Sequence, residues 1–191
     1  YEHRFPEEGA ELHFLSRLWG QPSLTFLGHE YRAPFVCFES FENMSDDELR
    51  SYSAIIVPSG MVSDRLRYTE DVNKLSPATA FVQRAFAEKD ILKGIICHGM
   101  WLLASTPELV RGRPVVVHNN LVGDARNMGA IYTDQDVVVV AYRALCRDAP
   151  AHRAAEPRYP VRLEAFRPRT VHDALRQRML AEGLGPRRAR Q

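Results

Sequence analysis

Cys97, His98 and Gly99 form the part of this sequence best suited to chemistry. The apolar residues 90–96 (DILKGII) predict a buried strand, and residues 100–105 (MWLLAS) begin a helical pattern without a linker between them. A residue at such a turn lies beyond the carboxyl edge of the sheet, where open α/β sheets bind their ligands. The sequence therefore predicts that Cys97 is a nucleophile on a strand-to-helix elbow.

The predicted elbow would favour reaction at sulfur. Serine nucleophiles are held in the same kind of strained turn, and Gly99 leaves room where strand and helix approach closely. Free amide hydrogens at a helix start favour a thiolate over a thiol, and the pKa of a free cysteine is about 8.5. A modest stabilisation would make Cys97 mostly thiolate at neutral pH. A buried structural cysteine is the alternative interpretation.

Composition restricts the remaining classes of function. The 191 residues carry a formal net charge of +1, which gives no electrostatic case for nucleic-acid binding. The three cysteines show no metal-like spacing, so we expect neither a disulfide framework nor a bound metal, and no cofactor is indicated. No signal peptide or bilayer-spanning apolar run is evident, and a cytoplasmic, membrane-free protein is expected.

Strands and helices alternate over residues 1–140, which predicts an α/β domain with a doubly wound, mostly parallel sheet and helices on both faces. The acid-rich start after Ser45 and the apolar spacing of residues 79–88 predict two of the helices. The expected strands are residues 10–15, 34–41, 54–57, 90–96, 114–118 and 137–140. Residues 141–191 are rich in arginine and proline and are expected to form an atypical C-terminal extension with one helix, over residues 171–183.

The segment around Cys97 (ICHG, residues 96–99) resembles the signature of the ThiJ/PfpI superfamily, relatives of the class I glutamine amidotransferase domains. The PfpI-type intracellular peptidase branch is the most similar. Residues 54–60 (AIIVPSG) resemble that family's strand ending in Pro-Gly-Gly, and residues 124–130 (DARNMGA) resemble another of its motifs. The resemblance covers residues 1–140 and implies a flavodoxin-like fold and a homo-oligomer, either a dimer or a hexamer.

The resemblance also assigns roles to individual residues. The backbone of Gly60 or Met61, together with the amide of His98, would form an oxyanion hole beside Cys97. His98 resembles the catalytic histidine of the peptidase branch, which works with an acid from a neighbouring subunit. Asp64 occupies the position of that acid. The alternative for Asp64 is an N-cap of the helix that follows.

Two further residues are candidates for the site. His118 follows the apolar run 114–117 and resembles the active-site histidine of another family member, although a satisfied polar residue at a strand end is the alternative. Histidine near neutral pH is a suitable general acid or base for thiolate chemistry. Trp101 follows the elbow closely enough to line a pocket, with core packing as its alternative.

The sequence departs from the family at both ends. The family's first strand, and the glutamate that follows it and binds the nucleophilic cysteine, are missing, because residues 1–5 already resemble the next helix. We expect either that the chain is truncated or that another segment fills the gap. After residue 140 the usual final strand and helix are replaced, which a shifted reading frame or a natural extension would explain.

Two classes of function follow from these residues. The first is a cysteine-dependent enzyme that acts on a small carbonyl or amide substrate, as a hydrolase or as a glyoxalase or deglycase. The second is a non-catalytic redox sensor or chaperone-like stress protein that uses the same cysteine. A weaker third is a ligand-binding partner in a biosynthetic pathway.

Overall fold

The computed structural model describes residues 1–28 and 31–140, so the predicted extension over residues 141–191 and its helix lie outside the described residues. Eight short strands alternate with five α-helices and three 3₁₀ helices in this part of the chain. They run in the order α1 (Arg4–Glu7), β1 (Leu15–Ser16), β2 (Leu24–Leu27), β3 (Pro34–Cys37), β4 (Glu39–Ser40), α2 (Asp46–Ser51), β5 (Ala54–Val57), α3 (Val62–Leu66), α4 (Pro77–Ala87), β6 (Leu92–Ile95), η1 (Cys97–Leu103), η2 (Pro107–Leu109), β7 (Pro114–Val115), η3 (Asn119–Leu121), α5 (Val122–Asn127) and β8 (Ile131–Tyr132).

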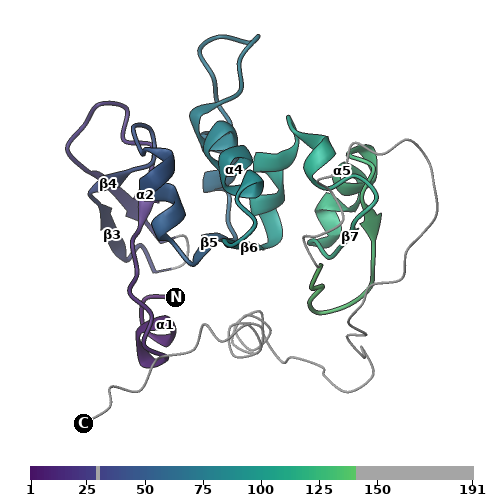
Figure 1. Ribbon diagram of the computed structural model, residues 1–191, viewed down its shortest axis with the longest axis horizontal. Coiled ribbons are helices and arrows are strands. Elements are labelled where there is room, and N and C mark those ends of the chain that lie inside the picture. The colour runs from purple at the N-terminus through teal and green to yellow at the C-terminus, as the bar shows by residue number, and fades with distance from the viewer. Residues whose placement is uncertain (29–30, 141–191) are drawn as a thin grey trace.

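The strands of the described residues form four two-stranded ladders. The pairs β1–β4, β5–β6 and β7–β8 are parallel, and β2–β3 is antiparallel. Figure 1 shows three groups in a row: β3, β4 and α2, then β5, β6 and α4, then β7 and α5. The α/β alternation predicted from the sequence is present. One continuous doubly wound sheet stays a prediction, because no ladder among the described residues joins these groups.

The parallel pair β5–β6 positions the elbow. Ala54 pairs with Leu92 and Val57 with Ile95, so both strands end at the same edge. The apolar run in β5 predicts burial on both faces, yet only Val57 is buried and the other three residues are half-buried. The prediction of full burial was therefore wrong for these three residues, whose faces are only partly covered, and in the described part of the chain β5 pairs with β6 alone.

Helices α2 and α4 each begin directly after a serine N-cap. Ser45 Oγ accepts a hydrogen bond from Glu48 N, which confirms the predicted N-cap of α2. Ser76 caps α4 in the same way through Thr79 N, and Pro77 fits the first turn because its missing N–H would be unpaired there. The apolar side of α4 then enters the main core, where Phe81 stacks on Phe41.

Several strands are shorter than predicted, because backbone pairing stops where the partner strand stops. The strand expected over residues 10–15 is reduced to Leu15–Ser16, and that over 34–41 is divided at Phe38 into β3 and β4. Only Pro114 and Val115 remain of the strand expected over 114–118.

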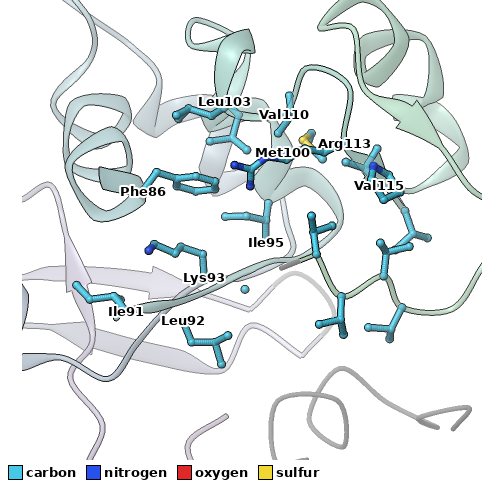
Figure 2. A pocket seen from close by; sticks show the side chains of 18 of the residues that line it. Phe86, Ile91, Leu92, Lys93, Ile95, Met100, Leu103, Val110, Arg113 and Val115 are labelled. Carbon is cyan, nitrogen blue, oxygen red and sulfur yellow. The ribbon is translucent and has the colours of Figure 1, made fainter. Parts of the chain in front are cut away.

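The strand expected over residues 137–140 is absent. An apolar run meets the burial requirement of a strand, but a strand also needs a neighbouring backbone with which to pair. These four valines instead line a cavity of about 190 Å³ together with apolar residues of β6 and η1. Figure 2 shows Leu92, Ile95, Met100 and Val115 around this cavity. Neither Cys97 nor His98 lines it.

The helix after the elbow also differs from the prediction. It begins at Cys97 itself rather than at residue 100, and it is a seven-residue 3₁₀ helix. The dipole of one short 3₁₀ helix supports a thiolate less than a long α-helix would, because fewer aligned peptides contribute. Side-chain partners therefore matter more at this site than the sequence suggested.

No helix within residues 1–28 and 31–140 has the length and hydropathy needed to cross a bilayer.

Candidate active site

Cys97 occupies the strained turn between β6 and η1. Its φ is 52°, in the left-handed region that residues other than glycine rarely adopt. The turn is fixed on both sides: Ile96 N donates to Val57 O at 3.0 Å, and Gly99 N donates to Ile96 O at 2.9 Å. Such a conformation costs about 1–3 kcal/mol and persists only where the surroundings impose it. The predicted strand-to-helix elbow is therefore present.

Gly99 allows the end of β5 to approach this turn. A Cβ at position 99 would lie 2.9 Å from Val57 Cγ1, 3.1 Å from Val57 O and 3.2 Å from Pro58 O. Two of these neighbours are backbone atoms, which cannot rotate away. The close approach predicted for Gly99 is confirmed, although the neighbour is β5 rather than the strand that precedes the elbow.

His98 is the side-chain partner of Cys97. Its Nδ1 lies 3.0 Å from Cys97 Sγ, and both residues are half-buried. Within residues 1–28 and 31–140, Cys97 Sγ has no other hydrogen-bond partner. A thiol at this distance from an imidazole nitrogen can transfer its proton to the ring and leave a thiolate.

Trp101 packs against the imidazole of His98. The two rings are 4.7 Å apart between centroids and nearly perpendicular, at 80°. Its indole Nε1 donates to Asp124 Oδ2 at 3.3 Å, and the Arg67 guanidinium lies over the ring with Cζ 5.1 Å from the centroid. Trp101, Arg67 and Asp124 also line a cavity of about 210 Å³ beside η1. Cys97 and His98 do not line this cavity, and Trp101 also packs against the main core, so its place in a substrate pocket stays a prediction.

His118 is a second aromatic neighbour of His98. Its ring centroid is 5.6 Å from that of His98, and the residue is exposed. His118 Nδ1 accepts a hydrogen bond from Asn120 N at 3.2 Å, so the side chain caps η3. This contact directs the proton of a neutral ring to Nε2. The structure brings His118 near the elbow, and its catalytic role stays a prediction.

Asp64 does not contact His98 in this chain. Its Oδ1 accepts hydrogen bonds from Arg67 Nε at 3.0 Å and from Arg67 Nη2 at 2.7 Å. The alternative that Asp64 caps a helix is wrong, because α3 begins at Val62 and Met61 occupies the N-cap position. An N-cap must precede the first turn, whereas Asp64 lies inside it.

The predicted oxyanion donors lie on the loop after β5 and at the start of η1. Gly60 has a φ of 112°, which only glycine adopts without strain. Among the described residues, the amides of Gly60, Met61 and His98 have no hydrogen-bond acceptor. These amides are therefore available to a ligand, and their use as an oxyanion hole stays a prediction.

Arg67 and Asp124 contact the site but were not selected as site residues from the sequence. The spacing of Asp64 and Arg67, three residues apart in one helix, was readable as an ion pair. No sequence pattern connects Trp101 with Asp124, because η1 and α5 meet only through the fold. In the described part of the chain, no group of three or more His, Cys, Asp or Glu side chains is arranged to hold a metal ion.

These features define an α/β protein with a cysteine at the position of a nucleophile elbow: the turn at Cys97, the close approach of Gly99 to β5, and the contact between Cys97 and His98. Residues 30–145 match the DJ-1/PfpI family, and the chain belongs to that family. The resemblance to the ThiJ/PfpI superfamily stated from the sequence is thereby confirmed.

Several relatives are similar to this chain. The "Putative cysteine protease YraA" of Bacillus subtilis is 28% identical over 123 residues, which cover 64% of this chain and 62% of that protein. A protein of Staphylococcus epidermidis, SERP1413, is 31% identical over 97 residues, covering 51% and 53%. A two-domain protein with DJ-1/ThiJ/PfpI-like and ferritin-like domains from Anabaena variabilis superposes with a TM-score of 0.51 and 23% identity, covering 62% of this chain and 31% of that one. This likeness supports the fold.

The chain spans about half to two thirds of the length of these curated relatives. The family match supports the α/β, flavodoxin-like fold class. Together with the Bacillus relative, it also supports a cysteine nucleophile as chemistry found within the family.

Proposed function

We propose that this protein is a cysteine-dependent enzyme that acts on a small carbonyl or amide substrate through Cys97. The observation that carries the proposal is the pairing of Cys97 Sγ with His98 Nδ1 at 3.0 Å on a turn with a φ of 52°. A structural cysteine gains nothing from a strained backbone or an imidazole partner. A nucleophile gains both an exposed position and a proton acceptor.

In the proposed mechanism His98 accepts the thiol proton at Nδ1, and the sulfur attacks the electrophilic carbon of the substrate. The C=O π bond breaks as the C–S bond forms, and its electron pair becomes an oxyanion. The free amides of His98 and of Gly60 or Met61 are the proposed donors to this oxygen. With an aldehyde, His98 returns the proton to the oxyanion and a thiohemiacetal forms. With an amide, the oxyanion re-forms the C=O bond as the C–N bond breaks, and His98 gives its proton to the departing amine. Water then hydrolyses the resulting thioester and frees the thiol.

His118 and Asp64 have secondary roles in this proposal. Nε2 of His118 is the nitrogen left to exchange protons, because Nδ1 accepts from Asn120 N. Asp64 is exposed, and we propose that it can also approach His98 of a second copy in a homo-oligomer. In that arrangement Oδ2 would face His98, because both hydrogen bonds from Arg67 end on Oδ1.

A 2-oxoaldehyde is the preferred substrate class. Conversion of a 2-oxoaldehyde to a 2-hydroxy acid adds one water and needs no external oxidant, because one carbon is oxidised as its neighbour is reduced. Small aldehydes need only a small site. The free thiols at Cys37 and Cys97 suit a reducing compartment, and we propose the cytoplasm.

The test is turnover of methylglyoxal to D-lactate by the full chain and by the Cys97→Ser and His98→Gln variants. We expect measurable turnover in the wild type, loss of at least about a hundredfold in Cys97→Ser, and a similar loss in His98→Gln. Turnover that persists in Cys97→Ser would contradict the proposal. A parallel assay with a small amide substrate separates the hydrolase from the glyoxalase.

A redox sensor is the second candidate function. Cys97 is half-buried rather than enclosed, and no carboxylate among the described residues contacts its sulfur. In this function a hydroperoxide transfers one oxygen to the thiolate, which becomes a sulfenic acid while the peroxide is reduced to an alcohol or water. Absence of turnover together with rapid trapping of a sulfenic acid at Cys97 would favour the sensor.

A further inference from the structure

Trp101 joins the proposed nucleophile pair to an ion pair on a different helix. The indole packs against His98, whose Nδ1 lies 3.0 Å from Cys97 Sγ. The guanidinium of Arg67, which binds Asp64, also lies over the indole ring. The contacts form a continuous path from α3 through η1 to the sulfur.

The 3₁₀ geometry of η1 explains why His98 and Trp101 meet. Residues three apart eclipse one another in a 3₁₀ helix, whereas in an α-helix they are offset around the axis. His98 and Trp101 are separated by three residues within Cys97–Leu103. The unusual helix type therefore places the indole directly beside the imidazole, and the observed rings are nearly perpendicular at 80°.

The indole is held at two further points, so it can act as a fixed support. Its Nε1 donates to Asp124 Oδ2 in α5 at 3.3 Å, and the Arg67 cation lies over its ring. Arg67 cannot swing away freely, because Nε and Nη2 both bind Asp64 Oδ1. Elements η1, α3 and α5 thus each contribute to the orientation of one ring.

We propose that Trp101 is a positioning residue for His98, and that Arg67 and Asp124 act through it to hold Nδ1 against the sulfur of Cys97. The proposal rests on the proposed function for its importance to turnover, but the geometry can be tested without turnover. The titratable neighbours of His98 are Cys97 on its own helix and His118 before η3. Arg67 at the C-cap of α3 and Asp124 on α5 contact Trp101 instead, and Asp64 binds Arg67. If Trp101 lost its contacts with Arg67 and Asp124, the imidazole of His98 could move away from the thiol of Cys97, and a smaller fraction of Cys97 would be thiolate.

The experiment uses indole fluorescence, because a protonated imidazole in contact with an indole quenches its emission more than a neutral one does. The chain has two tryptophans, so the Trp19→Phe background leaves Trp101 as the reporter. We expect its emission to fall as the pH is lowered through the titration of His98, and His98→Gln to abolish that change. A pH profile without any His98-dependent change would overturn the proposal.

Two variants then test the supports in the same background. Arg67→Gln and Asp124→Asn are expected to shrink the His98-dependent change and to slow alkylation of Cys97 by iodoacetamide at neutral pH by about three- to tenfold. Arg65→Gln is the matched control, because it removes the same charge from α3 at a residue without an ion pair among the described residues. If Arg65→Gln and Arg67→Gln changed the fluorescence and the alkylation rate equally, the cause would be the lost positive charge and not the contact with Trp101. That outcome would refute the proposal.

Variants of Trp101 itself separate positioning from folding. Trp101→Phe keeps an aromatic ring beside His98 and is expected to retain most of the alkylation rate, whereas Trp101→Ala loses it while thermal unfolding stays cooperative. Equal rates in both variants would overturn the proposal. If methylglyoxal turnover is absent but the fluorescence and alkylation results hold, the proposed function fails and the positioning role stands.

Discussion

At the scale of single residues, the two described cysteines have opposite environments. Cys37 is 3% exposed, its Sγ donates to Phe14 O at 2.9 Å, and burial raises the pKa of its thiol. Cys97 is half-buried and has an imidazole nitrogen as its partner. The same residue type is thus enclosed in one place and, in the other, has the partner that the proposed function requires of a nucleophile.

This contrast predicts selective alkylation. At neutral pH we expect iodoacetamide to modify Cys97 at least about tenfold faster than Cys37, because only a thiolate reacts, and burial both encloses the Cys37 thiol and raises its pKa. The measurement is mass spectrometry of the two cysteine peptides over time. Unfolding in urea is the control, since it should bring the two rates together. Faster labelling of Cys37 in the native protein would contradict the proposed activation of Cys97.

At the scale of elements, local sequence patterns predicted what depends on neighbours along the chain. Ser45 predicted the start of α2, and the apolar runs predicted β5 and β6. The same patterns failed where pairing or helix type depends on distant segments. Residues 137–140 have the composition of a strand without a paired backbone, and η1 is a 3₁₀ helix although its sequence is compatible with an α-helix.

The candidate site divides in the same way. Cys97, His98 and Gly99 were recognisable because three consecutive residues at a predicted turn carry the chemistry. Arg67 and Asp124 were not, because their contact with Trp101 arises from the packing of α3 and α5 around η1. Pairwise contacts between elements leave no trace in a single sequence.

The elbow makes a second prediction, through the glycine that the packing of β5 requires. Gly99→Ala would place a Cβ within 3.2 Å of two backbone oxygens, so we expect a loss of about 1–3 kcal/mol in the free energy of unfolding and slower alkylation of Cys97. Gly123→Ala in α5 is the matched control, because a Cβ there meets nothing within 4 Å. Alanine should be neutral or stabilising at this helical position. Urea denaturation and alkylation rates of both variants check the prediction, which fails if the two substitutions behave alike.

At the scale of the whole molecule, a buried arginine connects the N-terminal strands with the loop that follows α3. Arg17, directly after β1, donates from Nε to Glu42 at 3.0 Å and from Nη2 to Glu70 at 2.8 Å. Its Nη1 reaches Tyr68 O at 3.4 Å. Because β1 pairs with β4, Arg17 links these strands to Tyr68, the residue after Arg67.

The two carboxylates are expected to differ in their importance to stability. The side chain of Arg17 is 9% exposed, that of Glu42 is 23% exposed and that of Glu70 is 59% exposed. In Arg17→Met, Glu42 would keep a partly buried charge without its cation, and we expect a loss of about 2–4 kcal/mol in the free energy of unfolding, somewhat below the range for a fully buried pair. Glu70→Gln should cost less than about 1 kcal/mol, because water replaces its partner.

A double-mutant cycle of Arg17→Met and Glu42→Gln, followed by urea denaturation, tests this account. The double variant should be more stable than the sum of the two single losses implies, because removing both charges leaves neither one buried alone. Methionine keeps most of the aliphatic volume of the arginine, so a lost charge is separated from a cavity. Additive losses, or a larger loss in Glu70→Gln than in Glu42→Gln, would show that Arg17 contributes through packing or through the exposed pair instead. Because Arg17 also contacts the segment beside Arg67, the same variants should be assayed for alkylation of Cys97, which we expect to be slower in Arg17→Met than in Glu70→Gln.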